Sequence, residues 1–136
     1  MTVTRGLPNI CTDRMEETRD FYVDLLGFVV GTVHPGWYIQ LVSPTDPRLL
    51  IGIVRRDAEF TPEAFQRPAQ GVIISVQVDD VDAVHAAAVK RGLQIAQGLR
   101  DQDFGMRHFM VVDPSGLLVN VLAFPYAPHN SPSTRQ

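Results

Sequence analysis

The side chains best suited to acid–base, thiol or metal chemistry in this sequence are four histidines and one cysteine, far apart along the chain. Cys11 and His108 fall in strand-like patterns, and with Asn9 they form a chemically possible metal-binding set. No pair of histidines at i,i+4 and no paired carboxylates support such a site. The other histidines fall in a Pro-Gly turn, a helical pattern and a Pro/Ser-rich end segment, where we expect solvated side chains: His34, His85 and His129.

Cys11 and His108 each have a simpler interpretation than a catalytic one. A general base usually needs a partner that orients its ring, and the sequence shows no carboxylate partner for His108. We therefore expect His108 to be packed and hydrogen-bonded. We expect Cys11 to be a small core residue, because no basic neighbour in the sequence would activate its thiol.

The composition limits the possible partners. A chain of 136 residues with 45% hydrophobic residues is of one-domain size with an ordinary core. The net charge of −3 is spread without runs, so we expect neither a nucleic-acid partner nor a membrane partner. The single cysteine excludes an internal disulfide framework, and no long apolar segment or leader is evident. We therefore expect a cytoplasmic protein.

The elements that must position these residues are clearest near the end of the sequence. Residues 104–122 read FGMRHFMVVDPSGLLVNVL, two apolar runs joined by Asp-Pro-Ser-Gly. Proline fixes one φ angle and glycine tolerates a positive one, so residues 113–116 predict a tight turn. The segment is therefore predicted to be a β-hairpin.

The rest of the sequence predicts one unit occurring twice. In the first half, a strand over 7–12 precedes a helix that is capped by Asp13 and Glu16 and ends at Gly27. Strands over 28–33, 37–42 and 49–54 follow. In the second half, a strand over 72–78 precedes a helix that is capped by Asp79 or Asp80 and ends at Gly92. A strand over 93–96 and the final hairpin follow.

This order predicts an α+β fold of two βαβββ modules, each a sheet with a helix on one face. We expect one domain with module one at about 5–56, a linker at 57–70, module two at 71–124 and a flexible tail at 125–136. The linker contains a short helix start at Thr61, next to Phe60 and Phe65, and is a candidate lid.

Strand alternation predicts which side chains lie on the face away from the helices. That face combines apolar groups with a few amides, a hydroxyl, a phenol and an imidazole, a composition typical of a small-molecule pocket. A half-exposed sheet facing water would alternate in the same way, so alternation leaves both interpretations open. The residues grouped by parity are Leu7, Asn9, Cys11, Tyr38, Gln40, Val42, Ile73, Ser75, Gln77, His108, Met110, Leu118, Asn120 and Leu122.

The unit order, with DFYVDLLGF at 20–28 and FMVVDPSG at 109–116, resembles the vicinal oxygen chelate superfamily over about residues 5–124. That superfamily includes glyoxalases, extradiol dioxygenases and bleomycin or mitomycin resistance proteins. The resemblance implies two βαβββ modules forming a cupped mixed sheet. It also implies a homodimer, either swapped or side by side, with cupped sites that often draw on both chains. One fold hosts several chemistries, so the resemblance does not choose a function.

Enzymes of this superfamily hold a divalent metal with His or Glu on strands of both modules. The matching positions here are Leu7, Gln40, Ile73 and Asn120. Leucine and isoleucine have no donor atom, and neutral amides cannot neutralise a divalent cation. We therefore predict no metal and no other cofactor.

The sequence favours a metal-free protein that binds a small aromatic organic molecule in a cupped site of the dimer, similar to the drug-sequestering members of the superfamily. Trp37 has the opposite strand parity to Gln40, so it has an alternative interpretation as a core residue that faces the helix. Phe104 either forms a wall of the pocket or only anchors its loop. Two alternatives are a metal-dependent lyase or dioxygenase with unaligned ligands, and a non-catalytic accessory dimer. The predicted ligand-binding residues are Asn9, Trp37, Tyr38, Gln40, Ser75, Phe104, His108 and Asn120.

Overall fold

The structure, a computed structural model, describes residues 1–125, so the rest of the predicted tail lies outside the described residues, His129 included. The described chain forms two compact units. The first holds residues 1–71 with 113–117, and the second holds the remaining residues. In chain order the elements are β1 (Asn9–Thr12), α1 (Met15–Leu26), β2 (Val29–His34), β3 (Tyr38–Val42), β4 (Leu50–Arg55), the short 3₁₀ helix η1 (Glu63–Phe65), β5 (Ile73–Gln77), α2 (Val81–Lys90), β6 (Ile95–Asp101), β7 (Arg107–Val112) and β8 (Leu118–Ala123).

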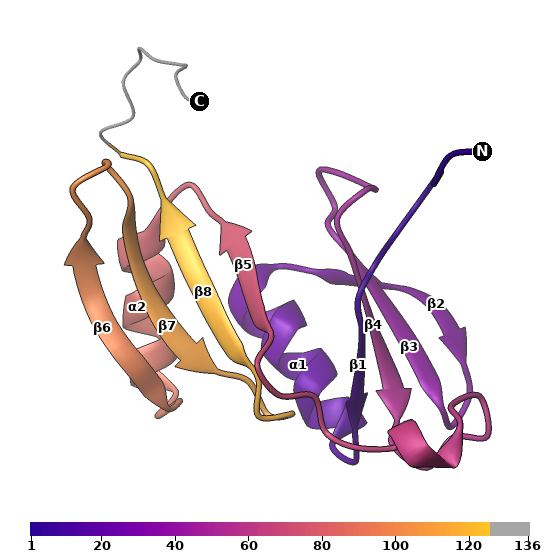
Figure 1. The fold of residues 1–136 in the computed structure, drawn as a ribbon. Coiled ribbons are helices and arrows are strands. Elements are labelled where there is room, and N and C mark those ends of the chain that lie inside the picture. The colour runs from indigo at the N-terminus through magenta and orange to yellow at the C-terminus, as the bar shows by residue number, and fades with distance from the viewer. Residues whose placement is uncertain (126–136) are drawn as a thin grey trace. The chain divides into compact units, whose positions relative to one another are not determined.

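Each unit is one βαβββ module, as predicted, and the fold class is α+β (Figure 1). The first sheet has the order β1-β4-β3-β2 and the second β5-β8-β7-β6. In each sheet the first strand pairs in parallel with the last strand of its module, and the other pairings are antiparallel. The predicted final hairpin is β7 paired with β8.

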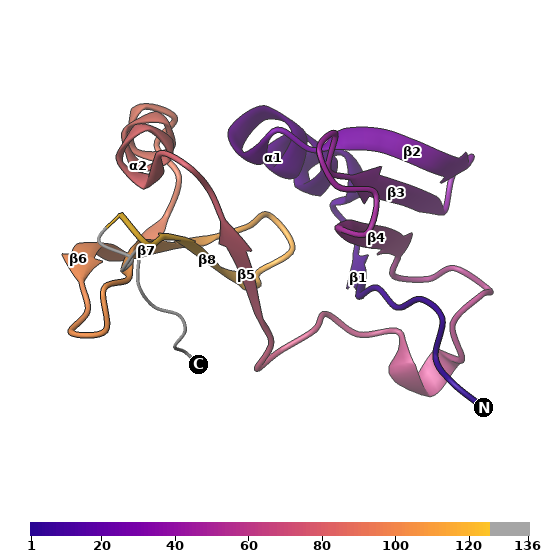
Figure 2. The same ribbon diagram turned by 90° about the horizontal axis from the view of Figure 1, so that it is seen from above.

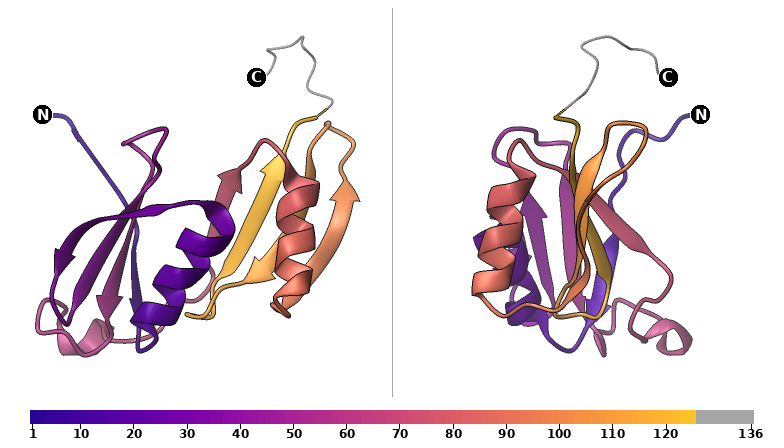
Figure 3. Two further views of the ribbon diagram at one scale, coloured as in Figure 1. Left: turned by 180° about the vertical axis from the view of Figure 1, so that it is seen from behind. Right: turned by 90° about the vertical axis from the view of Figure 1, so that its left-hand side faces the viewer.

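One face of each sheet is covered by the helix of its own unit (Figure 2). In the first unit α1 contacts β3 and β4, and in the second α2 contacts all three antiparallel strands (Figure 3). The strand residues on the helix side are the most deeply buried, such as Leu41 and Ile53 in the first sheet and Val119 and Val121 in the second. Burial of these apolar side chains stabilises each module and fixes which residues face the other way.

The predicted capping box at the start of α1 is wrong. Arg14 takes the N-cap position without a side-chain cap, and its own N–H donates to the Thr12 hydroxyl at 2.9 Å. Asp13 instead accepts from the Arg56 guanidinium, 2.8 Å away. The Asp13 carboxylate, which the local sequence pattern predicted to cap α1, is therefore bound by Arg56 at the end of the neighbouring strand β4. The predicted end of the helix at Gly27 is confirmed, and Gly27 adopts a left-handed conformation with φ of 77°.

The predicted cap of α2 is confirmed, since the Asp80 carboxylate accepts from the Ala83 N–H at 3.0 Å. The strand predicted over 93–96 is displaced and too short, because β6 runs from Ile95 to Asp101. Two register shifts against β7 interrupt the alternation that would reveal such a strand in the sequence. No helix within residues 1–125 is long and apolar enough to cross a membrane.

The turn between β7 and β8 belongs to the first unit. The Tyr22 hydroxyl on α1 donates to Oδ2 of Asp113 at 2.6 Å, and both side chains are buried. Oδ1 of Asp113 accepts from the N–H groups of Ser115 and Leu117 at 2.8 and 3.0 Å, which shapes the predicted turn from within.

Candidate functional site

A hollow of about 380 Å³ lies on the first unit and takes in four of the predicted site residues. Asn9 comes from β1, Tyr38 and Gln40 come from β3, and Trp37 directly precedes β3. The strand residues are on the face away from α1, because they alternate with buried Ile10, Ile39 and Leu41. The hollow is completed by Arg5, Thr32, His34 and Phe60.

Gly52 on β4 lies beneath polar side chains that line this hollow. It is the register partner of both Asn9 on β1 and Gln40 on β3, so the three residues form one row across the sheet. A Cβ atom at position 52 would lie 1.8 Å from Oδ1 of Asn9 and 2.9 Å from Oη of Tyr38. The missing side chain therefore leaves room for two polar groups to lie directly over the sheet.

The polar groups over Gly52 are ordered. Nε2 of Gln40 donates to Oη of Tyr38 at 3.2 Å, which fixes the amide against the phenol. Asn9 and Gln40 present donors and acceptors on the same row, and neither carries a charge. This arrangement can orient a ligand by hydrogen bonds but offers no proton-transfer pair.

Aromatic rings form one wall of the hollow. Trp37 stacks on His34 with ring centroids 5.1 Å apart and an interplanar angle of 8°. Trp37 also stacks on Phe60 of the linker, with ring centroids 5.3 Å apart and an interplanar angle of 29°. Tyr38 lies at 5.6 Å from Trp37. The core alternative for Trp37 fails because the residue lies in the turn before β3, where strand parity does not apply.

The remaining predicted site residues belong to the second unit, where three form a hydrogen-bonded chain across β5, β8 and β7. Nδ1 of His108 lies 2.8 Å from Oδ1 of Asn120, and Nδ2 of Asn120 donates to Oγ of Ser75 at 3.2 Å. His108 and Asn120 are only 3% and 8% exposed, whereas Ser75 is exposed. Phe104 lies in the loop between β6 and β7 with 66% of its surface exposed.

Two glutamines that sequence reasoning missed complete this chain. Nε2 of Gln102 lies 2.8 Å from Nε2 of His108, and Nε2 of Gln97 lies 3.4 Å away. Because an amide nitrogen only donates, His108 accepts at Nε2 and donates from Nδ1 to Asn120. The predicted packed, hydrogen-bonded histidine is thus what the structure shows. Strand alternation could not place Gln97 on the same face as His108, because β6 pairs irregularly with β7 at this position.

Cys11 is half-buried at the end of β1, with its Sγ atom 4.0 Å from the carbonyl oxygen of Arg56. Burial raises the pKa of the Cys11 thiol, and the nearby Arg56 guanidinium opposes this change without overcoming it. A thiol with a raised pKa is a poor nucleophile near neutral pH.

The residues present do not fit the divalent metal that the resemblance implies. Leu7 and Ile73 have no donor atoms, and Oδ1 of Asn120 already accepts from His108. Gln40 offers only a neutral amide held by Tyr38. Across residues 1–125, no group of three or more His, Cys, Asp or Glu side chains could hold a metal ion.

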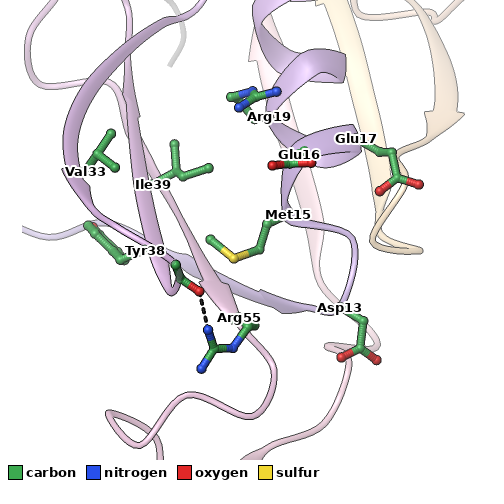
Figure 4. A pocket seen from close by; sticks show the side chains of 10 residues that line it. Asp13, Met15, Glu16, Glu17, Arg19, Val33, Tyr38, Ile39 and Arg55 are labelled. Atoms are coloured by element: carbon green, nitrogen blue, oxygen red, sulfur yellow. Dashed lines mark hydrogen bonds between the residues drawn. The ribbon is translucent and has the colours of Figure 1, made fainter.

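A second hollow, of about 370 Å³, opens on the helix side of the first sheet (Figure 4). Its charges come largely from the start of α1, including Glu16 and Arg19, and from Arg55, which donates to the carbonyl of Gly36. Of the predicted site residues it takes in only Tyr38. The hollow lined by Trp37 and Phe60, called the aromatic hollow below, is therefore the better candidate for a ligand site.

Comparison with known proteins bears on the family. The family model described as Glyoxalase/Bleomycin resistance protein/Dioxygenase superfamily matches residues 5–121. The chain belongs to this superfamily. The predicted resemblance is thus confirmed, and the two βαβββ modules are those of a superfamily member.

Several solved structures share the fold at low sequence identity. TioX from Micromonospora sp. ML1 is 20% identical with a TM-score of 0.70, over 90% of this chain and 99% of that one. A superfamily member from Sphaerobacter thermophilus is 21% identical with a TM-score of 0.69, over 90% and 98%. A lactoylglutathione lyase from Agrobacterium tumefaciens is 16% identical with a TM-score of 0.67, over 90% and 96%. No curated protein matches the sequence.

Proposed function

We propose that this superfamily member is a metal-free binding protein that holds a flat aromatic organic molecule in the hollow of the first unit. The observation that carries the proposal is the combination of a stacked aromatic wall with uncharged hydrogen-bonding groups over Gly52. Neither a nucleophile–base pair nor a cation-binding set accompanies them among the described residues.

The aromatic wall suits a planar ligand. Phe60 is 64% exposed, so one face of its ring is free to pack on another ring. Offset stacking on aromatic side chains contributes about 0.5–1.5 kcal/mol per pair beyond the burial of apolar area. Asn9 and Gln40 would then select the orientation of polar substituents, because displaced water leaves their amides in need of partners.

The other predicted ligand-binding residues lie in the second unit and form a separate group there. Ser75 is exposed at the end of its hydrogen-bonded chain, and its O–H is free to donate because its oxygen accepts from Asn120. Asn120 and His108 would hold Ser75 in place, and exposed Phe104 would add an aromatic contact.

The proposal is tested with a library of planar aromatic compounds, by calorimetry and by the fluorescence of Trp37, the single tryptophan of the chain. A ligand that binds only the folded state raises its stability by RT ln(1 + [L]/Kd). We expect a thermal shift together with a change in Trp37 fluorescence, and the thermal shift should be lost in Trp37→Leu. Turnover of a bound compound would indicate an enzyme instead, and a complete lack of binding would indicate an accessory protein.

We further propose a cytoplasmic protein that forms a homodimer, with the second copy of the chain covering exposed apolar surface. All six residues of the edge strand β2 are exposed, including Val29, Val30 and Val33. An uncovered edge strand with apolar side chains invites pairing. Sedimentation equilibrium should give the mass of two chains, and the mass of one chain at high protein concentration would contradict the dimer.

A further inference from the structure

We propose that the aromatic hollow of the first unit selects ligands that carry a negative charge, with Arg5 as the group that recognises it. This inference rests on the proposed function, since it names the class of molecule that the same hollow takes. The expected ligand is a planar aromatic acid, with its rings on Trp37 and Phe60 and its anionic group at Arg5.

The charge of the hollow is one-sided. Arg5 lies in its lining, and the described residues that line it include no aspartate or glutamate. The other lining groups are aromatic rings, amides and a hydroxyl, with one imidazole at His34. A cation without a counter-charge in a partly apolar hollow favours an anionic ligand, because the apolar walls strengthen its field.

Arg5 also differs from most arginines of the chain. Within residues 1–125 it forms no ion pair or hydrogen bond, so its guanidinium is available to a ligand. A guanidinium can donate two parallel hydrogen bonds to one carboxylate. Other arginines are already held by aspartate or glutamate, namely Arg14, Arg19, Arg48, Arg55, Arg56 and Arg107.

In this arrangement the hollow would recognise the aromatic rings and the anionic group of the ligand separately. Stacking on Trp37 is blind to charge, whereas the pairing with Arg5 is absent for a neutral analogue. Arg5 is exposed, so water and salt weaken the pairing and its effect on affinity should be modest.

The test uses two matched probes, 2-naphthoate and its neutral amide 2-naphthamide, titrated into the full-length protein by isothermal calorimetry. We expect naphthoate to bind about fivefold more tightly than naphthamide. Raising NaCl from about 50 to about 500 mM should remove most of this preference, because exposed charges are screened at high salt.

The variant Arg5→Gln should weaken naphthoate binding to the level of naphthamide and leave naphthamide binding unchanged. Arg48→Gln is the matched control, because Arg48 pairs with Asp46 and does not line the hollow. It should leave the binding of both probes unchanged. Trp37→Phe, which keeps a ring, should weaken both probes equally.

The outcomes separate the two proposals. If neither probe binds or changes the fluorescence of Trp37, the aromatic site itself is wrong. If both probes bind equally well, the aromatic site stands and the charge selection is wrong. If naphthoate is preferred but Arg5→Gln retains the preference, the role of Arg5 is wrong.

Discussion

At the scale of single residues, the candidate site depends on the absence of a side chain at Gly52. Asn9 and Gln40 flank this position on neighbouring strands, and Oη of Tyr38 reaches over it. A methyl group added at position 52 would overlap Oδ1 of Asn9. The side chain of Asn9 can therefore keep its place over the sheet only if residue 52 is glycine.

We therefore expect Gly52→Ala to destabilise the protein by about 1–3 kcal/mol and to abolish aromatic binding in the hollow. Gly98→Ala on β6 is the matched control, because a Cβ atom there meets nothing within 4 Å. Chemical denaturation and calorimetric titration measure the two effects. Unchanged binding in Gly52→Ala would show that the polar groups over Gly52 are not part of a ligand site.

At the scale of elements, the two helices begin differently although aspartates precede both. Asp80 caps α2, whereas Asp13 pairs with Arg56 and leaves the start of α1 to Thr12. Loss of a side-chain cap typically costs about 1 kcal/mol, and loss of an exposed ion pair costs less.

We expect Asp80→Ala to lower the free energy of unfolding by about 1 kcal/mol and Asp13→Ala to lower it clearly less. Urea denaturation of the two variants measures this difference under identical conditions. Equal losses would mean that Asp13 also stabilises a helix start.

The bond between Tyr22 of α1 and Asp113 of the β7–β8 turn joins elements far apart in the sequence. Burial, reinforced by the Asp113 carboxylate, raises the pKa of the Tyr22 phenol well above its ordinary value. The folded state therefore keeps this proton at a pH where the unfolded chain releases it. The resulting stability is fully present below the ordinary tyrosine pKa of about 10 and declines as the pH rises above it.

Tyr22→Phe should lower stability by about 1–3 kcal/mol at neutral pH, because Oδ2 of buried Asp113 loses its partner. The difference between wild type and variant should shrink as the pH rises beyond about 10. Urea denaturation from pH 7 to pH 11 follows this trend. A difference that stays constant over the whole range would contradict the raised pKa.

At the scale of the whole molecule, chemistry-bearing side chains are dispersed. Cys11 and His34 lie near the ends of β1 and β2, His85 lies on α2, and His108 belongs to a buried hydrogen-bonded chain. The superfamily fold is retained, while the positions predicted to match the metal ligands of its enzymes carry apolar or amide groups.

We expect dialysis against a chelator to leave both the midpoint of thermal unfolding and aromatic-ligand affinity unchanged. Elemental analysis of protein purified without chelator accompanies the test. Stoichiometric zinc, nickel, manganese or iron would overturn the metal-free proposal, because it would require ligands that the described residues do not bring together.

The sequence alone determined the order of elements and the faces of the strands. Turn residues such as Pro114 and Gly116 act locally, and burial in β3 follows the alternation of its sequence, so both can be read from short segments. Only the tertiary structure decided that Gly52 lies between Asn9 and Gln40. It also decided that Asp13 pairs with Arg56 and does not cap α1, and that Phe60 stacks on Trp37. These contacts join segments distant in sequence through sheet pairing and linker path, and no local pattern encodes such geometry.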